Sequence, residues 1–131
     1  MHQILQPKEW VRPKGYANGM TAQGRFVFTA GLIGWNSEEK FEHKDFCGQF
    51  EQTLKNTVAV LVEAGARPEH ITRMTCYITD KKQYLENIDA IGAIWRDVLG
   101  RIFPCMAVVQ VAALIEDEAL IEIETTAIVP E

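Results

Sequence analysis

The sequence lacks the features that mark nucleic-acid-binding and membrane proteins. Its 13 Lys and Arg residues are spread out, the nearest approach to a basic run is Lys81-Lys82, and the formal net charge is −5. Binding to a phosphate backbone relies on clustered cations, so we expect no nucleic-acid partner. No apolar stretch approaches the ~20 residues of a membrane-spanning helix, and the first residues do not resemble a signal peptide. We therefore expect a soluble, cytoplasmic protein that does not associate with a membrane.

Cysteine and histidine are too scattered to suggest a disulfide framework or a metal site. The chain has 3 Cys and 3 His residues. An odd cysteine count without a secretory signal argues against structural disulfides. No pair of these residues has a spacing typical of zinc ligands. We expect neither a bound metal nor a cofactor.

The composition that is present is typical of one globular domain. The 131 residues are 47% hydrophobic and 24% charged, which suffices for one hydrophobic core but not for two. The sequence contains no clear internal repeat and no low-complexity linker. We expect a single domain over residues 1–131.

Local patterns in the first half predict a hairpin followed by a helix. Residues 25–31 are rich in strand-forming residues, and we expect them to form a hairpin with residues 16–21. Apolar residues at helical spacing predict a helix that begins at Phe46. Asp45 is the expected N-cap, and Gly65 is expected to end the helix in a left-handed conformation.

Local patterns in the second half predict a strand, a helix and another hairpin. Residues 71–79 alternate between two faces, which indicates a strand with one face in the core. Asp80 is expected to cap a second helix that ends at Gly100. Two apolar segments rich in β-branched residues, 103–111 and 120–127, predict a C-terminal hairpin joined by an acidic turn.

This order of elements predicts an α+β fold. Two helices cannot cover both faces of so wide a sheet, so we expect both on one face of a mixed β-sheet. Residues 107–114 are apolar on both faces, a pattern typical of a strand buried on both faces. We therefore expect other subunits to bury the face that the helices leave uncovered.

The two C-terminal segments resemble the signature of the Rid proteins, also called the YjgF/YER057c/UK114 family. In that signature a Phe-Pro-x-Arg segment enters the first strand, a Val-Glu-Ile-Glu segment forms the second, and the arginine holds the substrate carboxylate. Here Phe103-Pro104-Cys105-Met106 has a methionine at the arginine position, and Ile121-Glu122-Ile123-Glu124 matches the second segment. Weaker matches follow in the family's order over nearly the whole chain, at residues 15–19, 29–31, 52–56, 63–66 and 84–87. The chain is identified as a divergent member that lacks the substrate-binding arginine.

The resemblance implies a Rid/chorismate-mutase-like fold in a barrel-like homotrimer, with ligand pockets at the subunit clefts. It also implies hydrolysis of reactive enamines and imines, which releases ammonia and leaves a ketone or keto acid. By position, Tyr16 would offer its phenol to the substrate or water, and Glu122 would orient or deprotonate the water. The backbone amide of Gly31 would bind a substrate oxygen, and Asn87 would brace the pocket wall.

Simpler interpretations of several residues stay open. Tyr16 also fits a surface or interface aromatic, and Glu122 fits a solvated carboxylate on a strand edge. Trp35 either covers a subunit seam or offers a flat wall to an unsaturated substrate. Cys105 alternates to the face opposite Met106 and has no His nearby in the sequence, so packing is favoured over a nucleophilic role.

Met106 is either core filler or part of the cleft wall. A charge-assisted hydrogen bond is worth about 1.5–3 kcal/mol, so without the arginine small imino acids lose their main anchor. Lys14 is the candidate replacement cation, because it precedes Tyr16 by two residues and shares its side of an extended segment. Arg96 and Arg101 are weaker candidates, because one follows an expected core tryptophan and the other lies past the end of the helix.

We predict an enamine or imine hydrolase that acts on a substrate larger than a simple imino acid. The alternative is a non-catalytic trimer that binds a small metabolite or a protein partner in the same clefts. The ribonuclease activity sometimes attached to this family is not favoured, because the chain is acidic and has no basic groove.

Overall fold

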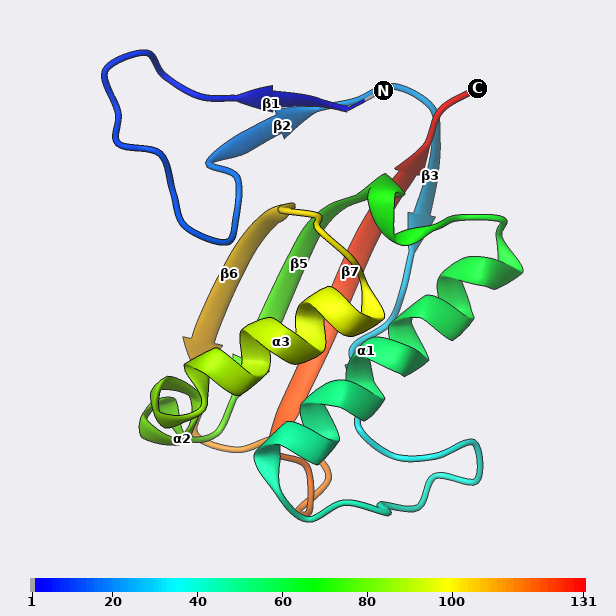
Figure 1. Ribbon diagram of the computed structural model, residues 1–131. Coiled ribbons are helices and arrows are strands. Elements are labelled where there is room, and N and C mark those ends of the chain that lie inside the picture. The colour runs from blue at the N-terminus through cyan, green and yellow to red at the C-terminus, as the bar shows by residue number, and fades with distance from the viewer. Residues whose placement is uncertain (1) are drawn as a thin grey trace.

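A computed structural model describes residues 2–131, which form an α+β structure of a sheet and a helical layer (Figure 1). The elements in chain order are β1 (Gln3–Leu5), β2 (Gly19–Thr21), β3 (Arg25–Phe28), β4 (Leu32–Ile33), α1 (Phe46–Glu63), a short 3-10 helix (Pro68–His70), β5 (Ile71–Ile78), α2 (Lys81–Glu86), α3 (Ile88–Val98), β6 (Cys105–Gln110) and β7 (Ile121–Val129).

The main sheet is mixed and has the strand order β3-β7-β5-β6, with β4 also paired to β7. β5 and β6 are parallel, whereas β7 is antiparallel to β3, β4 and β5. Parallel neighbours need a crossover connection, which α2 and α3 provide between β5 and β6. Figure 1 shows α1 and α3 on the same face of this sheet, so the predicted fold class is confirmed.

Both predicted hairpins are wrong in their strand pairing. β2 pairs with β1, and β3 pairs with β7, so these neighbours in sequence are not partners. β5 lies between β6 and β7. At the end of β5 the Ile78 carbonyl accepts from the N–H of Val111 at 2.8 Å, while the Thr79 N–H donates to the Leu120 carbonyl at 3.3 Å. β5 therefore holds the two C-terminal segments apart, one on each side.

The predicted strand over residues 107–114 is shorter than expected. β6 ends at Gln110, whose side-chain oxygen accepts a hydrogen bond from the N–H of Lys81 at 2.6 Å. In residues 2–131 the only strand that pairs with β6 is β5, and apart from an isolated bridge between Cys105 and Ala17 its other edge is open.

The helices begin where the sequence predicts, but the second one is divided. The Asp45 carboxylate caps α1 by accepting from the N–H of Gly48 at 2.9 Å, and Gly65 beyond its end has φ +71°. Asp80 caps α2 in the same way. The predicted continuous helix then breaks at Asn87, whose side-chain amide donates to the carbonyl four residues earlier at 2.8 Å. Such a local side-chain bond competes with the helix, so α2 and α3 are separate.

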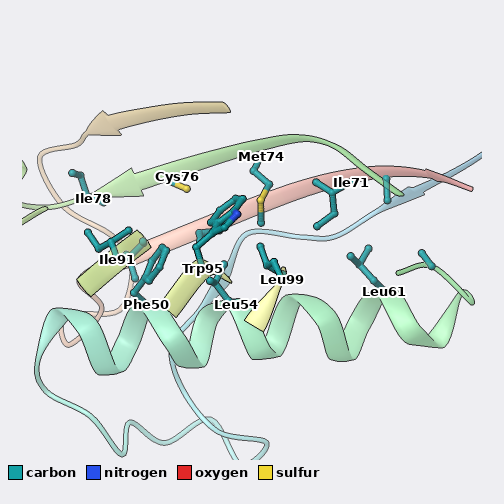
Figure 2. Close-up of a cluster of buried hydrophobic side chains, with 14 of the residues drawn as sticks. Phe50, Leu54, Leu61, Ile71, Met74, Cys76, Ile78, Ile91, Trp95 and Leu99 are labelled. Carbon is teal, nitrogen blue, oxygen red and sulfur yellow. The ribbon is translucent and has the colours of Figure 1, made fainter. Parts of the chain in front are cut away.

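The core lies between the two helices and the sheet (Figure 2). The predicted alternation of β5 is confirmed, since Met74, Cys76 and Ile78 are all buried. Three further segments supply core residues: Phe50, Leu54 and Leu61 from α1, Ile91 and Trp95 from α3 with Leu99 just beyond its end, and Ile121 and Ile123 from β7.

The other face of the sheet carries exposed apolar side chains. Val27 is buried, so its neighbours Phe26 and Phe28 point to the opposite face, where they are 56% and 67% exposed. Their rings lie 6.1 Å apart. Val109 on β6 is also exposed. No helix among residues 2–131 covers this open face, and burial by other subunits stays a prediction.

Candidate ligand-binding site

A cavity of about 880 Å³ lies between α3, the start of β6 and the N-terminal loop. We call it the α3 pocket. Its walls are mainly apolar and aromatic, and this part of the lining consists of Phe50, Cys76, Tyr84, Ile88, Ile91, Trp95, Phe103, Met106 and Val108. Mostly apolar walls with few polar groups are typical of small-molecule sites, and the volume is at the upper end of their usual range.

The N-terminal loop is held against β6 by backbone contacts. The N–H of Ala17 donates to the Pro104 carbonyl at 3.1 Å, and Ala17 forms a parallel bridge with Cys105. Ala17 is buried, so these bonds fix the residue before it. Tyr16 therefore lines the α3 pocket together with Met106 and remains 42% exposed.

Three cations line the α3 pocket, namely Lys14, Arg96 and Arg101. In the part of the chain that the structure describes, no Asp or Glu lines this pocket, although the sequence has 18 acidic and 13 basic residues. Within residues 2–131, none of the ion pairs involves any of the three cations. Their charges are therefore available to a ligand.

The two arginines are positioned by α3 and the turn after it. A guanidinium nitrogen of Arg96 lies 3.5 Å from where a Cβ on Gly92 would be, so the side chain runs back over that glycine. The indole N–H of Trp95 donates to the Ile102 carbonyl at 3.1 Å and ties the following segment to the helix. This hydrogen bond holds the segment that carries Arg101.

A second group of polar residues lies on the open face of the sheet. We call it the open-face cluster, and it consists of Gly31, Tyr77, Glu122 and Glu124. A Cβ on Gly31 would overlap the Glu122 carboxylate, so the absence of a side chain there makes room for that group. Glu122 and Glu124 pair with Tyr77 and Thr75 of β5, so the two carboxylates share one face, as predicted.

One short hydrogen bond joins two residues of the open-face cluster. The Tyr77 hydroxyl donates to the Glu124 carboxylate at 2.6 Å. This bond raises the pKa of Tyr77, with smaller contributions from desolvation and from the charges of Glu124 and Glu122. The cluster therefore combines two carboxylates with a phenol that stays protonated to higher pH than an ordinary tyrosine.

The α3 pocket and the open-face cluster lie on opposite faces of the sheet. Glu122 stands between Ile121 and Ile123, which are fully buried under the helices, so its side chain points away from them. Met106 pairs with the buried Met74 and faces the helices. Within one chain the structure thus brings Lys14, Tyr16 and Met106 together, and separately Gly31 and Glu122.

Trp35 and Asn87 lie outside both groups. The Trp35 ring packs on Phe41 with centroids 5.8 Å apart, and its carbonyl accepts from the Asn56 side chain at 2.8 Å. Asn87 separates α2 from α3 and accepts a hydrogen bond from the Cys47 thiol at 3.5 Å. Because the next residue, Ile88, lines the α3 pocket, Asn87 contacts its wall only indirectly.

The cysteines are all free. Burial raises the pKa of the Cys76 thiol to about 12, and burial with the nearby Asp45 charge raises that of Cys47. Cys105 is partly exposed near the open face, on the side opposite Met106. In the described part of the chain, no three His, Cys, Asp or Glu residues gather as metal ligands, and no helix is long and apolar enough to span a bilayer.

The structure places Arg96 and Arg101 in the α3 pocket beside Lys14, and it adds Tyr77 to the open-face cluster, a residue that the sequence analysis does not single out. Arg96 follows a buried tryptophan, and its guanidinium lies over the glycine four residues earlier. This i, i+4 relation between Gly92 and Arg96 is a signal that the sequence contains. Tyr77 joins the carboxylates only through the pairing of β5 with β7, which no local pattern specifies.

Comparisons with known proteins agree with this architecture. The sequence profile of the Endoribonuclease L-PSP family matches residues 10–129. A RutC family protein of Aquifex aeolicus is 36% identical over 98 residues, which are 75% of this chain and 78% of the relative. The structure of the Rid protein YyfB from Yersinia pestis superposes with a TM-score of 0.85 at 28% identity and covers 98% of both chains. The chain belongs to the Rid family.

Other Rid-family relatives match over nearly their whole length. The RutC family protein slr0709 of Synechocystis is 30% identical over 97% of this chain and 96% of its own. The structure of Escherichia coli TdcF with bound serine has a TM-score of 0.68 at 29% identity, over 97% of this chain and 98% of TdcF. This Rid protein thus has its family's fold.

Proposed function

We propose that the chain is an enamine or imine hydrolase acting on a substrate larger than a simple imino acid. The observation that carries the proposal is the α3 pocket, in which Tyr16 and Met106, at two signature positions of the family, share a cavity of about 880 Å³. A cavity of this size has room for a ligand larger than a small imino acid.

The reaction needs water positioning and proton transfer. The enamine tautomerises to the imine, and water then adds to the C=N carbon. The resulting carbinolamine loses its nitrogen as ammonia, and a carbonyl remains. A carboxylate that takes a proton from water and a phenol that donates a hydrogen bond supply the required chemistry. We assign these roles to Glu122 and Tyr16.

We further propose that these two groups meet between copies of the chain. Glu122 and Tyr16 lie on opposite faces of one sheet, so a single copy does not hold a water between them. The uncovered apolar face supports packing against other subunits, as does the resemblance, which implies a homotrimer. In this arrangement the open-face cluster of one subunit closes the α3 pocket of its neighbour.

Small imino acids are expected to be poor substrates. The thioether of Met106 cannot form the two parallel hydrogen bonds by which an arginine holds a carboxylate. The relative TdcF binds serine, a small amino acid. The α3 pocket of the present chain has a mainly apolar wall, with its cations at Lys14, Arg96 and Arg101.

The test is the rate of imine loss and ammonia release, with imines generated in situ by oxidation of tryptophan, phenylalanine or 2-aminobutyrate. We expect faster turnover of the aromatic imines than of 2-iminobutyrate. Glu122→Gln should lower kcat by about 100-fold or more, the usual effect of removing a general base. Glu116→Gln, in an exposed loop, is the matched control and should leave the rate unchanged. No acceleration by the wild type would refute the hydrolase proposal, and equal rates for wild type and Glu122→Gln would refute the role of Glu122 as the base.

A specific observation supports one alternative, a non-catalytic binding protein. The α3 pocket contains no carboxylate, so it could bind a ligand without reacting with it. Binding of an aromatic acid without any acceleration of imine hydrolysis would favour this alternative. We do not propose a ribonuclease, because the net charge is −5 and the cations are spread over the chain.

A further inference from the structure

The charge of the α3 pocket is opposite to that of the molecule. The chain has a formal net charge of −5, yet among residues 2–131 the charged side chains that line this pocket are Lys14, Arg96 and Arg101 alone. In residues 2–131 no carboxylate forms an ion pair with any of them. Cations gathered around low-dielectric walls focus their field and raise the local concentration of anions. The pocket is therefore suited to an acid rather than to a neutral or basic ligand.

The positions of the arginines separate the charged end of the pocket from its apolar wall. Arg96 lies along α3 above Gly92, and Arg101 follows the helix end. The residues of β6 that line the pocket, Met106 and Val108, are apolar. An anion held by the arginines would therefore have the apolar part of its molecule against α3 and β6.

Gly92 lies beside the Arg96 side chain. A Cβ at this position would be 3.5 Å from a guanidinium nitrogen, an ordinary van der Waals distance, so the guanidinium lies directly against this turn of α3. Gly92 and Arg96 both line the pocket.

We propose that Arg96 and Arg101 together bind the oxyanion of an aromatic or extended apolar acid, and that the body of this acid lies against Trp95, Ile88 and Met106. The inference deepens the proposed function, because it names the substrate class of the same site. The anion is a carboxylate or a phosphate ester, since guanidinium groups recognise both. Arg96 and Arg101 take the place of the family's arginine but hold the anion at a different part of the pocket.

The test uses three naphthyl probes of similar shape: 2-naphthoate, 2-naphthyl phosphate and the neutral 2-naphthalenemethanol. Their affinities are measured by calorimetry for the wild type, Arg96→Met, Arg101→Met and the double variant. Methionine keeps an apolar side chain of similar length and removes the charge. Arg67→Met is the matched control, because Arg67 pairs with Glu69 at 3.2 Å and does not line the pocket.

We expect each single substitution to weaken binding of an anionic probe by about tenfold, the usual effect of losing a charge-assisted hydrogen bond. The alcohol should bind with unchanged affinity in every variant, and added salt should weaken only the anionic probes. The anionic probe that loses more affinity when the arginines are replaced shows whether the ligand's anion is a carboxylate or a phosphate ester. Lys14→Met should have a smaller effect, because a lysine is a mobile point charge.

Equal binding of all three probes by the wild type, or unchanged affinity of both anions in the double variant, would overturn the assignment of the arginines. Binding is measured without turnover, so this outcome is distinct from failure of the hydrolase proposal. If Glu122→Gln binds 2-naphthoate like the wild type and the wild type hydrolyses no imine, the reaction is refuted and the ligand class is supported.

Discussion

At the scale of single residues, the hydrogen bond between Tyr77 and Glu124 determines how the open face responds to pH. The bond raises the pKa of Tyr77 above its ordinary value, and the charges of Glu124 and Glu122 act in the same direction. A group whose folded pKa lies above the unfolded value of about 10 stabilises the fold below that pH. This contribution is lost as the pH rises through the raised folded value.

We therefore predict that Glu124→Gln lowers the pKa of Tyr77 more than Glu122→Gln does. The first substitution removes the charged hydrogen-bond acceptor, whereas the second removes only a neighbouring charge. Ultraviolet titration of tyrosinate measures the pKa, and Tyr77→Phe identifies the signal. The difference in unfolding free energy between wild type and Tyr77→Phe should shrink above about pH 10. A Tyr77 titration unaffected by Glu124→Gln would contradict the prediction.

Sequence patterns predict some of the contacts around Glu122 but not others. Alternation along one strand correctly predicts that Glu122 and Glu124 share a face, because side chains in a strand have a period of two. The contact of Gly31 with Glu122 comes from a close approach of two segments far apart in sequence. No rule based on sequence spacing predicts such a contact, so in the sequence only the family resemblance places Gly31 and Glu122 in one site.

At the scale of elements, local signals predict where helices and strands begin, but not which strands pair. Asp45 and Asp80 cap their helices as expected, because capping depends on neighbouring residues alone. Strand pairing depends on contacts between distant segments, and here β5 enters between two strands that a short connection would allow to pair. The sequence pattern does not predict the break at Asn87, because the apolar periodicity continues from α2 into α3.

The element that most directly shapes the α3 pocket is α3 with the segment that follows it. We predict that Trp95→Phe lowers the free energy of unfolding by about 1–3 kcal/mol, because it leaves the Ile102 carbonyl without its indole partner and creates a gap in the core. It should also weaken 2-naphthoate binding, because Arg101 is no longer held in place. Urea unfolding and calorimetry measure the two effects. Trp10→Phe, at a residue that is 62% exposed, is the control and should change neither. If Trp95→Phe has the same free energy of unfolding as the wild type, the indole of Trp95 does not stabilise this part of the fold.

At the scale of the whole molecule, the open face is the feature that a single chain leaves unexplained. Phe26 and Phe28 are more than half exposed, and in the described chain the outer edge of β6 is open beyond the bridge of Cys105 with Ala17. Exposed apolar surface and strand edges of this kind favour association. We predict a homotrimer with a mass three times the 14.8 kDa of the chain, measured by light scattering. Phe28→Glu should reduce the mass, whereas Ile115→Glu, at a loop residue that is 93% exposed, should not.

The trimer yields a sharper prediction, because Glu122 and Tyr16 are on opposite faces of one chain. If each site combines Glu122 of one subunit with Tyr16 of its neighbour, then Glu122→Gln and Tyr16→Phe each inactivate every site in their own trimers. Trimers refolded from equal amounts of the two variants contain some sites with both native residues. Random mixing in a closed ring restores about one quarter of the wild-type sites. Imine hydrolysis by the mixture should therefore far exceed that of either variant alone. If both residues act within one chain, no site in the mixture is intact, and an inactive mixture of folded mixed trimers would rule out a shared site.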